Sequence, residues 1–436
     1  MKFNKWTMGL AAVGVVSLAS AARADEKMSQ VQTALSNTTL SGYVDVSAQW
    51  NLGSQNVQRA TGFGSTMPAY SFGGVGKADG FNLNAVDIVL DKPLDESPWA
   101  ACYHVEMMFG PDSVPLGNAA IAGIPLGGIG GGLGASSIRQ AYLALRTPVG
   151  NSGIDWKVGV FDTIIGYESS SDPLNPNYTR SYGYTLEPTT HTGILATYKL
   201  NDMISVSAGI ANTANSDAIY ARAFSVPAIV TGTGINNRAA LATQKTYLGS
   251  IALTAPDSWG FMKGATLNAG VIQSDNGTAS TGGTSALGTT SVYAGATVPT
   301  PWQALKVGAA FDFLELHNGG QGTLGNPSDD SVWNIGLYAN VQINDKASFN
   351  LRGEYMNDNG AGLYNGVAFG NTHADNNAEE VTATLQYNLW ANVLSRVEFR
   401  WDHVEHGDAF DRTTVGPNHA AHENAYMIAL NLIYQF

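Results

Sequence analysis

The chain is almost free of cysteine and poor in charge. Cys102 is the only cysteine among 436 residues, so the chain can form no internal disulfide. Charged residues make up 13% of the sequence, and no apolar run of about 18 residues follows the N-terminal one, which excludes a membrane helix there. Acidic residues outnumber basic ones by 35 to 22, which argues against nucleic acid as a partner. A closed hydrogen-bonded sheet would hold such a chain together.

The N-terminus has the pattern of a secretory signal. Two lysines precede an apolar run from Trp6 to Leu18, and Ala22-Arg23-Ala24 supplies a cleavage site. The alternative is an N-terminal membrane anchor, but that needs about 20 spanning residues and this run is shorter. We therefore predict a cleaved signal peptide over residues 1–24 and a short periplasmic lead over 25–38.

The remainder of the chain, 39–436, repeats a strand pattern. Sixteen segments of about ten residues alternate apolar and polar side chains with a period of two, which is typical of strands. They span 39–50, 81–91, 99–110, 138–147, 153–162, 190–200, 203–212, 244–254, 265–275, 288–298, 303–315, 332–343, 347–357, 379–390, 393–403 and 423–436. An even number is typical of bacterial single-chain outer-membrane barrels.

The connections between these segments alternate in length. Long ones, such as 51–80 and 163–189, are followed by short ones, such as 148–152 and 201–202, along the whole chain. Short periplasmic turns and long external loops produce this alternation, which a soluble β-sandwich has no reason to keep. The sequence therefore predicts an all-β fold: a transmembrane, antiparallel, up-and-down β-barrel of 16 strands in a bacterial outer membrane.

The charged residues fall on the polar rows of the strands. A charge is costly against lipid and well solvated in a water-filled lumen, so the polar rows are expected to face inward. The acidic candidates for the lumen wall are Asp45, Asp87, Glu106, Asp312, Glu354, Glu398 and Asp402. The basic candidates are Lys157, Lys306, Arg352, Arg396 and Arg400. This mixture, with the net acidity, predicts weak selectivity that favours cations.

The last strand has one continuous apolar face and ends on Phe436. Outer-membrane barrels close on such a strand, and a terminal aromatic residue resembles the signal that their assembly machinery reads. We therefore expect the barrel assembly machinery to recognise Phe436, and the apolar rows to contact outer-membrane lipid and lipopolysaccharide. The alternative is an ordinary amphipathic strand in a soluble sandwich.

Six stretches of sequence together carry a family likeness. They are LSGYVD (40–45), LNAVDIVLDKP (83–93), IRQAYLAL (138–145), VGVFDTIIGYE (158–168), NYTRSY (177–182) and HTG (191–193). With them the chain resembles the OmpL-like β-barrel porins over most of its mature length, most densely in the first half. The resemblance implies an outer-membrane pore and no particular substrate.

The third long connection, 163–189, is rich in tyrosine and stiffened by three prolines. In sixteen-stranded porins the third external loop commonly folds inward and narrows the channel. We predict that charged residues of this loop face basic residues of the wall across the channel and create a transverse field. They are Glu168, Asp172 and Arg180 on the loop, and Arg352, Arg396 and Arg400 on the wall. The alternative is an external loop that covers the rim.

The last long connection is rich in histidine. Two H-x-x-H pairs are formed by His403, His406, His419 and His422. Neutral imidazole is a common ligand of Zn²⁺, so the pairs are candidates for a metal site at the mouth. By strand alternation His403 faces lipid, which would remove one ligand. The alternatives are solvated histidines, or Ca²⁺ or Mg²⁺ bound by nearby carboxylates between lipopolysaccharide molecules.

These patterns predict a porin: a water-filled pore through which small hydrophilic solutes or ions diffuse passively. No nucleophile elbow and no H-E-x-x-H motif is present, so we expect no enzyme, no catalytic residue and no cofactor. The alternatives are a channel selective for a sugar or an anion, an outer-membrane hydrolase, and an adhesive barrel. Porins of this size are often homotrimers, although no sequence feature here shows a subunit interface.

Overall fold

The computed structural model describes the strands and the connections nearest to them. The described residues are 37–52, 79–113, 136–150, 152–212, 245–274, 288–317, 330–359, 376–405 and 423–436. The predicted signal peptide and nearly all of the predicted lead lie outside them. Within the described residues, no helix is long and apolar enough to cross a membrane.

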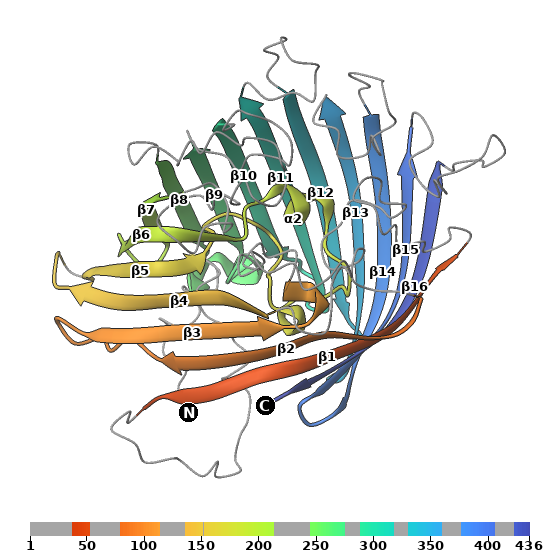
Figure 1. Ribbon diagram of the computed structural model, residues 1–436, viewed down its shortest axis with the longest axis horizontal. Coiled ribbons are helices and arrows are strands. Elements are labelled where there is room, and N and C mark those ends of the chain that lie inside the picture. The colour runs from red at the N-terminus through yellow and green to blue at the C-terminus, as the bar shows by residue number, and fades with distance from the viewer. Residues whose placement is uncertain are drawn as a thin grey trace, which may run out of the picture.

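Sixteen strands form one closed sheet in the described residues (Figure 1). Each strand pairs with its neighbours in the chain and β1 pairs with β16, which is the order of an antiparallel up-and-down barrel. The strands are β1 (Thr39–Leu52), β2 (Gly80–Lys92), β3 (Ala101–Phe109), β4 (Ser136–Thr147), β5 (Ile154–Asp162), β6 (Thr190–Lys199), β7 (Ile204–Ala211), β8 (Thr246–Thr254), β9 (Thr266–Ser274), β10 (Gly288–Pro299), β11 (Leu305–His317), β12 (Asp330–Gln342), β13 (Ala347–Asn359), β14 (Asn376–Trp390), β15 (Val393–Val404) and β16 (Asn424–Gln435). The helical turns are η2 (Pro111–Ser113), η3 (Asp172–Leu174), α2 (Tyr182–Leu186) and η4 (Asp257–Met262).

The predicted strand pattern is confirmed. All sixteen predicted segments are strands, and their ends differ from the predicted ones by at most three residues. Irregularities of register after Asp45, Glu106 and Asn388 disturb single strand pairs without changing the strand order. The period-two pattern was sufficient because lipid outside and a lumen inside require opposite side chains at successive residues.

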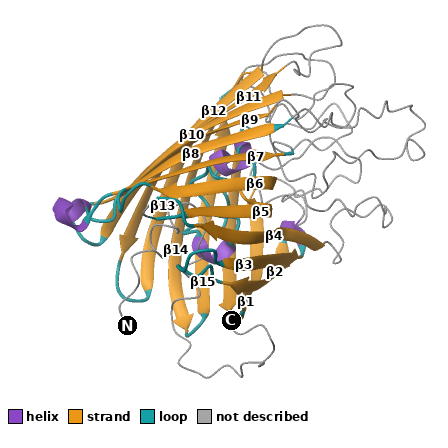
Figure 2. Ribbon diagram, turned by 90° about the vertical axis from the view of Figure 1, so that its left-hand side faces the viewer, coloured by secondary structure: helices purple, strands orange, loops and turns teal. Residues whose placement is uncertain are grey.

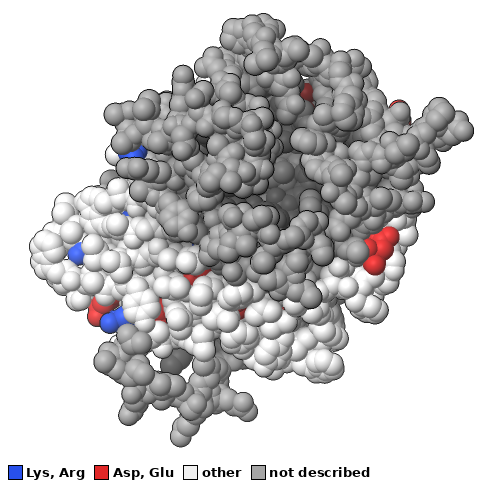
Figure 3. Space-filling view, in the orientation of Figure 1, with Lys and Arg blue, Asp and Glu red and all other residues white. Residues whose placement is uncertain are grey.

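The two faces of the sheet differ as the alternation predicts. Large apolar side chains such as Leu337, Phe349 and Leu430 are exposed on the outer face. Charged side chains of the inner face, such as Glu398 and Arg400, are buried inside the barrel. Figure 3 accordingly shows only scattered charged side chains among the described residues on the face in view.

The connection between β5 and β6, residues 163–189, lies inside the ring of strands (Figures 1 and 2). We call it the inner segment. It contains η3 and the single turn of α2, which begins where the Ser181 hydroxyl accepts a hydrogen bond from Tyr184 N at 3.0 Å. From there its groups reach the wall formed by β12 to β16. The inner segment therefore occupies part of the lumen.

The last strand closes the ring against the first. Gly42 N donates to Phe436 O at 3.1 Å, and Phe436 N donates to Gly42 O at 3.0 Å, one residue beyond the last strand position of β16. The apolar outward row of β16, with Tyr426, Leu432 and Tyr434, is exposed as predicted. Recognition of Phe436 by the assembly machinery stays a prediction.

Candidate functional site

The inner wall of β13, β14 and β15 carries its charges in rows. Arg352, Thr382 and Arg400 lie side by side, because the strand register pairs Arg352 with Thr382 and Thr382 with Arg400. The register aligns an acidic row two residues further along: Glu354, Glu380 and Asp402. A row that bears two cations thus lies beside a row of three carboxyl groups.

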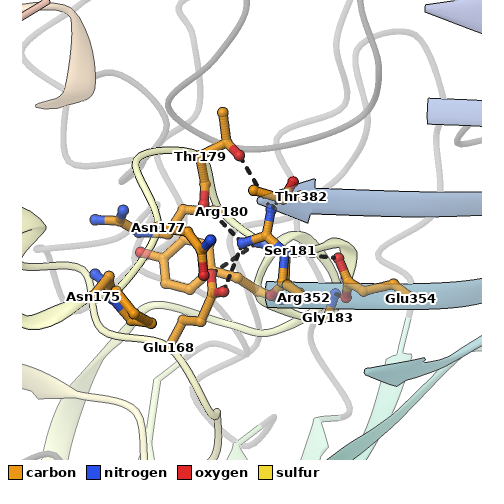
Figure 4. Close-up of polar contacts among 12 residues, drawn as sticks. Glu168, Asn175, Asn177, Thr179, Arg180, Ser181, Gly183, Arg352, Glu354 and Thr382 are labelled. Carbon is orange, nitrogen blue, oxygen red and sulfur yellow. Dashed lines mark hydrogen bonds and ion pairs between the residues drawn. The ribbon is translucent and has the colours of Figure 1, made fainter. Parts of the chain in front are cut away.

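Arg352 joins the inner segment to this wall (Figure 4). Its Nη1 donates to Glu168 Oε1 at 2.8 Å and to the carbonyl oxygen of Thr179 at 2.8 Å. Its Nε and Nη2 donate to Glu380 on the wall, each at 3.2 Å. The side chains of Arg352 and Glu168 are only 0% and 2% exposed, so these charge-assisted bonds are shielded from water.

Arg396 and Arg400 hold the inner segment by its main chain. Arg400 Nη1 donates to the carbonyl oxygen of Arg180 at 2.7 Å. Arg396 Nη2 donates to the carbonyl oxygen of Asp172 at 2.9 Å and also to that of Asn175. A segment with little regular structure leaves its carbonyl groups without backbone partners, and the guanidinium groups supply the missing donors.

Glu398 and Glu354 supply hydrogen-bond acceptors for the N–H groups of the inner segment. Tyr178 N donates to Glu398 Oε2 at 2.5 Å, and Thr179 donates to Glu398 Oε1 from its N at 2.9 Å and from its Oγ1 at 2.7 Å. Glu354 Oε2 accepts a hydrogen bond from Tyr182 N at 2.7 Å. The stretch 177–182, noted in the sequence as a family motif, is thus the part of the inner segment that bonds most densely to the wall.

Apolar contacts complete the attachment of the inner segment. Tyr182 and Leu186 pack in a cluster with inward side chains of five strands: Val332, Met356, Ala378, Val404 and Ala425. Ile164 and Ile165 pack in a second cluster that includes Leu195, Leu248, Ile272 and Tyr293. Tyr184 and Tyr178 of the inner segment belong to two further clusters, with inward side chains of β1 to β3, β15 and β16. The expectation of polar inward rows missed these apolar patches. The signal was present, because apolar residues interrupt the polar rows at these positions.

The charged residues of the inner segment also bond to one another. Arg180 Nη2 donates to Asp172 Oδ1 at 2.6 Å, and Glu168 Oε2 accepts a hydrogen bond from Ser181 N at 2.8 Å. Burial alone would lower the pKa of Arg180, but the carboxylate of Asp172 outweighs it and raises that pKa above its ordinary value. Arg180 is therefore a cation held within the inner segment.

Glu187, near the end of the inner segment, faces a carboxyl group of the wall. Burial and then the charge of Asp312 raise the pKa of Glu187 well above its ordinary value, and the two side chains share a hydrogen bond. Two carboxyl groups can share a hydrogen bond only when one of them carries a proton. Glu187 therefore holds its proton more tightly than an ordinary glutamate.

The structure brings together the six residues that the sequence placed at a constriction, in an arrangement that the sequence did not predict. Glu168 is in direct contact with Arg352, and the carbonyl groups of Asp172 and Arg180 accept from Arg396 and Arg400. The prediction had these groups opposed across an open channel. The three wall arginines are instead 0 to 2% exposed. They lie beneath the inner segment because its groups fill the space in front of them.

Among the described residues, one open space lies between the inner segment and the wall formed by β1 to β5. A cavity of about 880 Å³ is lined by inward residues of β1 to β5, by parts of β9 and β10, and by the inner segment itself. We call it the vestibule. It reaches the ends of strands that are joined by short turns, as the lining residues Lys92 and Thr297 show. None of Arg352, Arg396 and Arg400 lines it.

The histidine pairs lie largely outside the described residues, which exclude His406, His419 and His422. His403 is described: its ring stacks on Trp401 at 5.8 Å between centroids, and its Nδ1 is 3.1 Å from Asn424 Oδ1. Within the described residues, no group of three or more His, Cys, Asp or Glu is placed to hold a metal ion. The metal site thus stays a prediction.

Comparisons with solved structures agree with the barrel. The outer-membrane channel DcaP of Acinetobacter baumannii superposes with a TM-score of 0.56 at 13% identity, over 92% of this chain and 97% of that one. OmpF of Salmonella typhi, in complex with daunomycin, gives 0.55 at 12% identity over 93% and 99%. An anion-selective porin from Comamonas acidovorans gives 0.52 at 11% identity over 92% and 99%. At these identities the likeness shows the fold. No curated protein sequence matches the chain.

A closed barrel of sixteen antiparallel strands with a polar lumen and a loop folded into it is the architecture of a bacterial outer-membrane barrel. The family model described as "Putative beta-barrel porin-2, OmpL-like" matches residues 37–436, and the chain belongs to this family. The family resemblance noted in the sequence is therefore confirmed.

Proposed function

We propose that this porin passes small hydrophilic solutes and ions by passive diffusion, and that the inner segment is a fixed constriction. The carrying observation is the attachment of the segment to three buried arginines, Arg352, Arg396 and Arg400. In this proposal the arginines fix the aperture by holding the segment, and Arg352 does so partly through Glu168 of the segment. Solutes are selected by the width that remains and by the charges that line it.

The inner segment has too many attachments to act as a mobile lid. Six charged wall residues bond to it, and hydrogen bonds with one charged partner contribute about 1.5–3 kcal/mol each. Four apolar clusters add to this attachment. A constriction held this firmly gives one steady conductance rather than frequent opening and closing.

Deletion of residues 168–182 tests the proposal. The variant is refolded and inserted into planar bilayers, and its single-channel conductance is compared with that of the unchanged protein. We expect a larger conductance, because the deleted stretch occupies the lumen. Unchanged conductance in a barrel that still resists unfolding by detergent would show that the segment does not limit the flow.

The same recording separates a general porin from a selective one. A channel selective for a sugar or an anion would be blocked by its substrate, with a block that saturates as the concentration rises. A general diffusion porin shows conductance that scales with bath conductivity. A folded barrel that conducts nothing would favour an adhesive or enzymatic role instead.

The membrane setting of the barrel is part of the proposal. We infer that the short turns face the periplasm, and that the outer apolar rows contact lipid, lipopolysaccharide and two further copies of the chain in a homotrimer. One solved relative of similar fold, OmpT of Vibrio cholerae, is described in a trimer form, which supports the trimer. Mass measurement of the native complex in detergent tests it. Labelling of a cysteine placed at Asp345 on intact cells would contradict the orientation.

A further inference from the structure

The wall of the vestibule formed by β2 to β5 carries several ion pairs. Arg139 Nη1 bonds to Asp162 Oδ1 at 2.5 Å, and its other nitrogens bond to Glu106. Arg146 and Asp155 form two contacts of 2.6 Å. All five side chains line the vestibule, so a solute that enters it meets them.

His104 belongs to the same wall. Its Nδ1 lies 2.9 Å from Asp91 Oδ1 and its Nε2 lies 3.4 Å from Glu106 Oε2, so both ring nitrogens face carboxylates. Its ring stacks on Tyr142 with 5.1 Å between centroids. The wall thus contains a third acid–base pair beside the two arginine pairs.

In three of the five ion pairs of this wall the carboxylate is more exposed than the base. The side chain of Asp162 is 19% exposed and that of Arg139 only 4%. For Asp155 and Arg146 the values are 24% and 8%. Asp91 is 35% exposed and its partner His104 15%. Glu106 differs, because it is 4% exposed, like Arg139, and less exposed than His104 at 15%. Asp162, Asp155 and Asp91 are therefore the carboxylates of these pairs that a solute in the vestibule meets most directly.

The full lining of the vestibule has the same sign. Eight of its residues are acidic and four are lysine or arginine. Of the four, Lys157 lies 4.6 Å from the ring centroid of Tyr142, and within the described residues it has no acidic partner within ion-pair distance. Lys92, at the end of β2, likewise has no acidic partner within ion-pair distance in the described residues. Lys157 and Lys92 are therefore the cations of this wall that oppose the field of the carboxylates.

We propose that solutes cross the barrel on the β1–β5 side of the inner segment, and that the carboxylates exposed to the vestibule there favour cations and cationic solutes. This deepens the proposed function, because it assigns charge selectivity to a wall other than the one that holds the constriction. Asp91 promotes the preference and Lys157 opposes it. Arg352, Arg396 and Arg400 do not take part, since they are buried.

Reversal potentials in a gradient of potassium chloride across a planar bilayer test this inference. The unchanged porin should prefer potassium. Asp91→Asn should lower the ratio of potassium to chloride permeability, and Lys157→Gln should raise it, each by about two- to threefold. That is the size of effect expected for one unit charge several ångströms from the path in a medium of high dielectric constant. The effects should shrink in concentrated salt.

Two matched variants locate the path. Lys306→Gln removes the same charge from an exposed position at the start of β11, and Asp345→Asn removes a charge from the turn before β13. Neither residue lines the vestibule, so both changes should have smaller effects than their counterparts.

Three results would overturn the inference. They are a preference for chloride in the unchanged porin, an unchanged permeability ratio in Lys157→Gln, and an effect of Lys306→Gln as large as that of Lys157→Gln. If Asp91→Asn fails to fold, Lys157→Gln still decides the matter, because that side chain holds no acidic partner in place. A folded barrel without any conductance would instead refute the proposed function itself.

Discussion

Replacing Glu398 with glutamine should loosen the inner segment without removing it. Glu398 Oε1 accepts two hydrogen bonds from Thr179, and Oε2 accepts one from Tyr178 N at 2.5 Å and one from Thr384 Oγ1 at 2.7 Å. In Glu398→Gln the amide oxygen can keep the contacts with Thr179. The amide nitrogen then faces Tyr178 N, donor against donor, while the Thr384 hydroxyl can turn and accept from it.

The cost follows from the lost bond and the group left unpaired. A hydrogen bond to a charged acceptor contributes about 1.5–3 kcal/mol, and a buried N–H left without a partner costs about 1–3 kcal/mol more. The two effects overlap, so we expect a loss of about 3–4 kcal/mol in the free energy that holds the segment. A loss of about 3 kcal/mol raises the detached population by more than a hundredfold. Arg352, Arg396 and Arg400 remain, so the attached state still dominates.

The assay is single-channel recording, with limited proteolysis beside it. We expect brief steps to a larger conductance in Glu398→Gln and faster cleavage within 163–189. The control is Glu379→Gln on the neighbouring strand, since only the main-chain carbonyl of Glu379 contacts the segment, at 3.2 Å from Tyr182 Oη. Steady conductance and unchanged cleavage in a folded Glu398→Gln barrel would refute the assignment of Glu398 as an anchor.

Three other changes give separate expectations. Because the pKa of Glu187 is raised in the folded protein, its contribution to stability is present at low pH and is lost as the pH rises through that raised value. Glu187→Gln should remove this loss, which conductance steps recorded at several pH values would show. If the steps of Glu187→Gln change with pH as those of the unchanged porin do, this reasoning is wrong. Tyr182→Phe deletes a 2.7 Å hydrogen bond to Asp402 and should cost about 1.5–3 kcal/mol in urea unfolding, whereas a cost near zero would mean that the hydroxyl is solvated. A Cβ at Gly308 would lie 1.8 Å from Tyr167 Oη, so Gly308→Ala should displace that ring and destabilise the barrel by about 1–3 kcal/mol in the same assay, and equal or greater stability would contradict the contact.

The barrel could be predicted almost residue by residue because its environment acts on every residue separately. Each strand position meets either lipid or lumen, so the alternation in a stretch such as 393–403 determines its orientation without knowledge of the partner strands. The same parity correctly placed Arg396, Glu398 and Arg400 on the inner wall. Charge, stiffness and order in the chain also singled out 163–189 as the connection to examine.

The contacts of the inner segment could not be predicted in this way. Glu398 and Tyr178 lie 220 positions apart in the chain, and Arg352 and Glu168 lie 184 apart. No local pattern links such residues, because their approach depends on how the whole barrel closes. Parity also says only which face a side chain is on, and not whether another part of the chain covers it. The burial of the three arginines therefore had no signal in the strand pattern.

The charge rows explain why these arginines hold the segment instead of lining a pore. Arg352 already lies 3.2 Å from Glu380 and 3.6 Å from Glu354, and Arg400 lies 2.8 Å from Asp402. A cation that is neutralised by its own wall exerts little field on a passing solute, but it keeps N–H groups free to donate. Burial of those groups is tolerable only if acceptors meet them, and the carbonyl groups of the inner segment are such acceptors. A count of charges would assign the selectivity to this wall. The contacts instead give this wall the role of anchoring the segment, and in the inference above the selectivity belongs to the open carboxylates of β2 to β5.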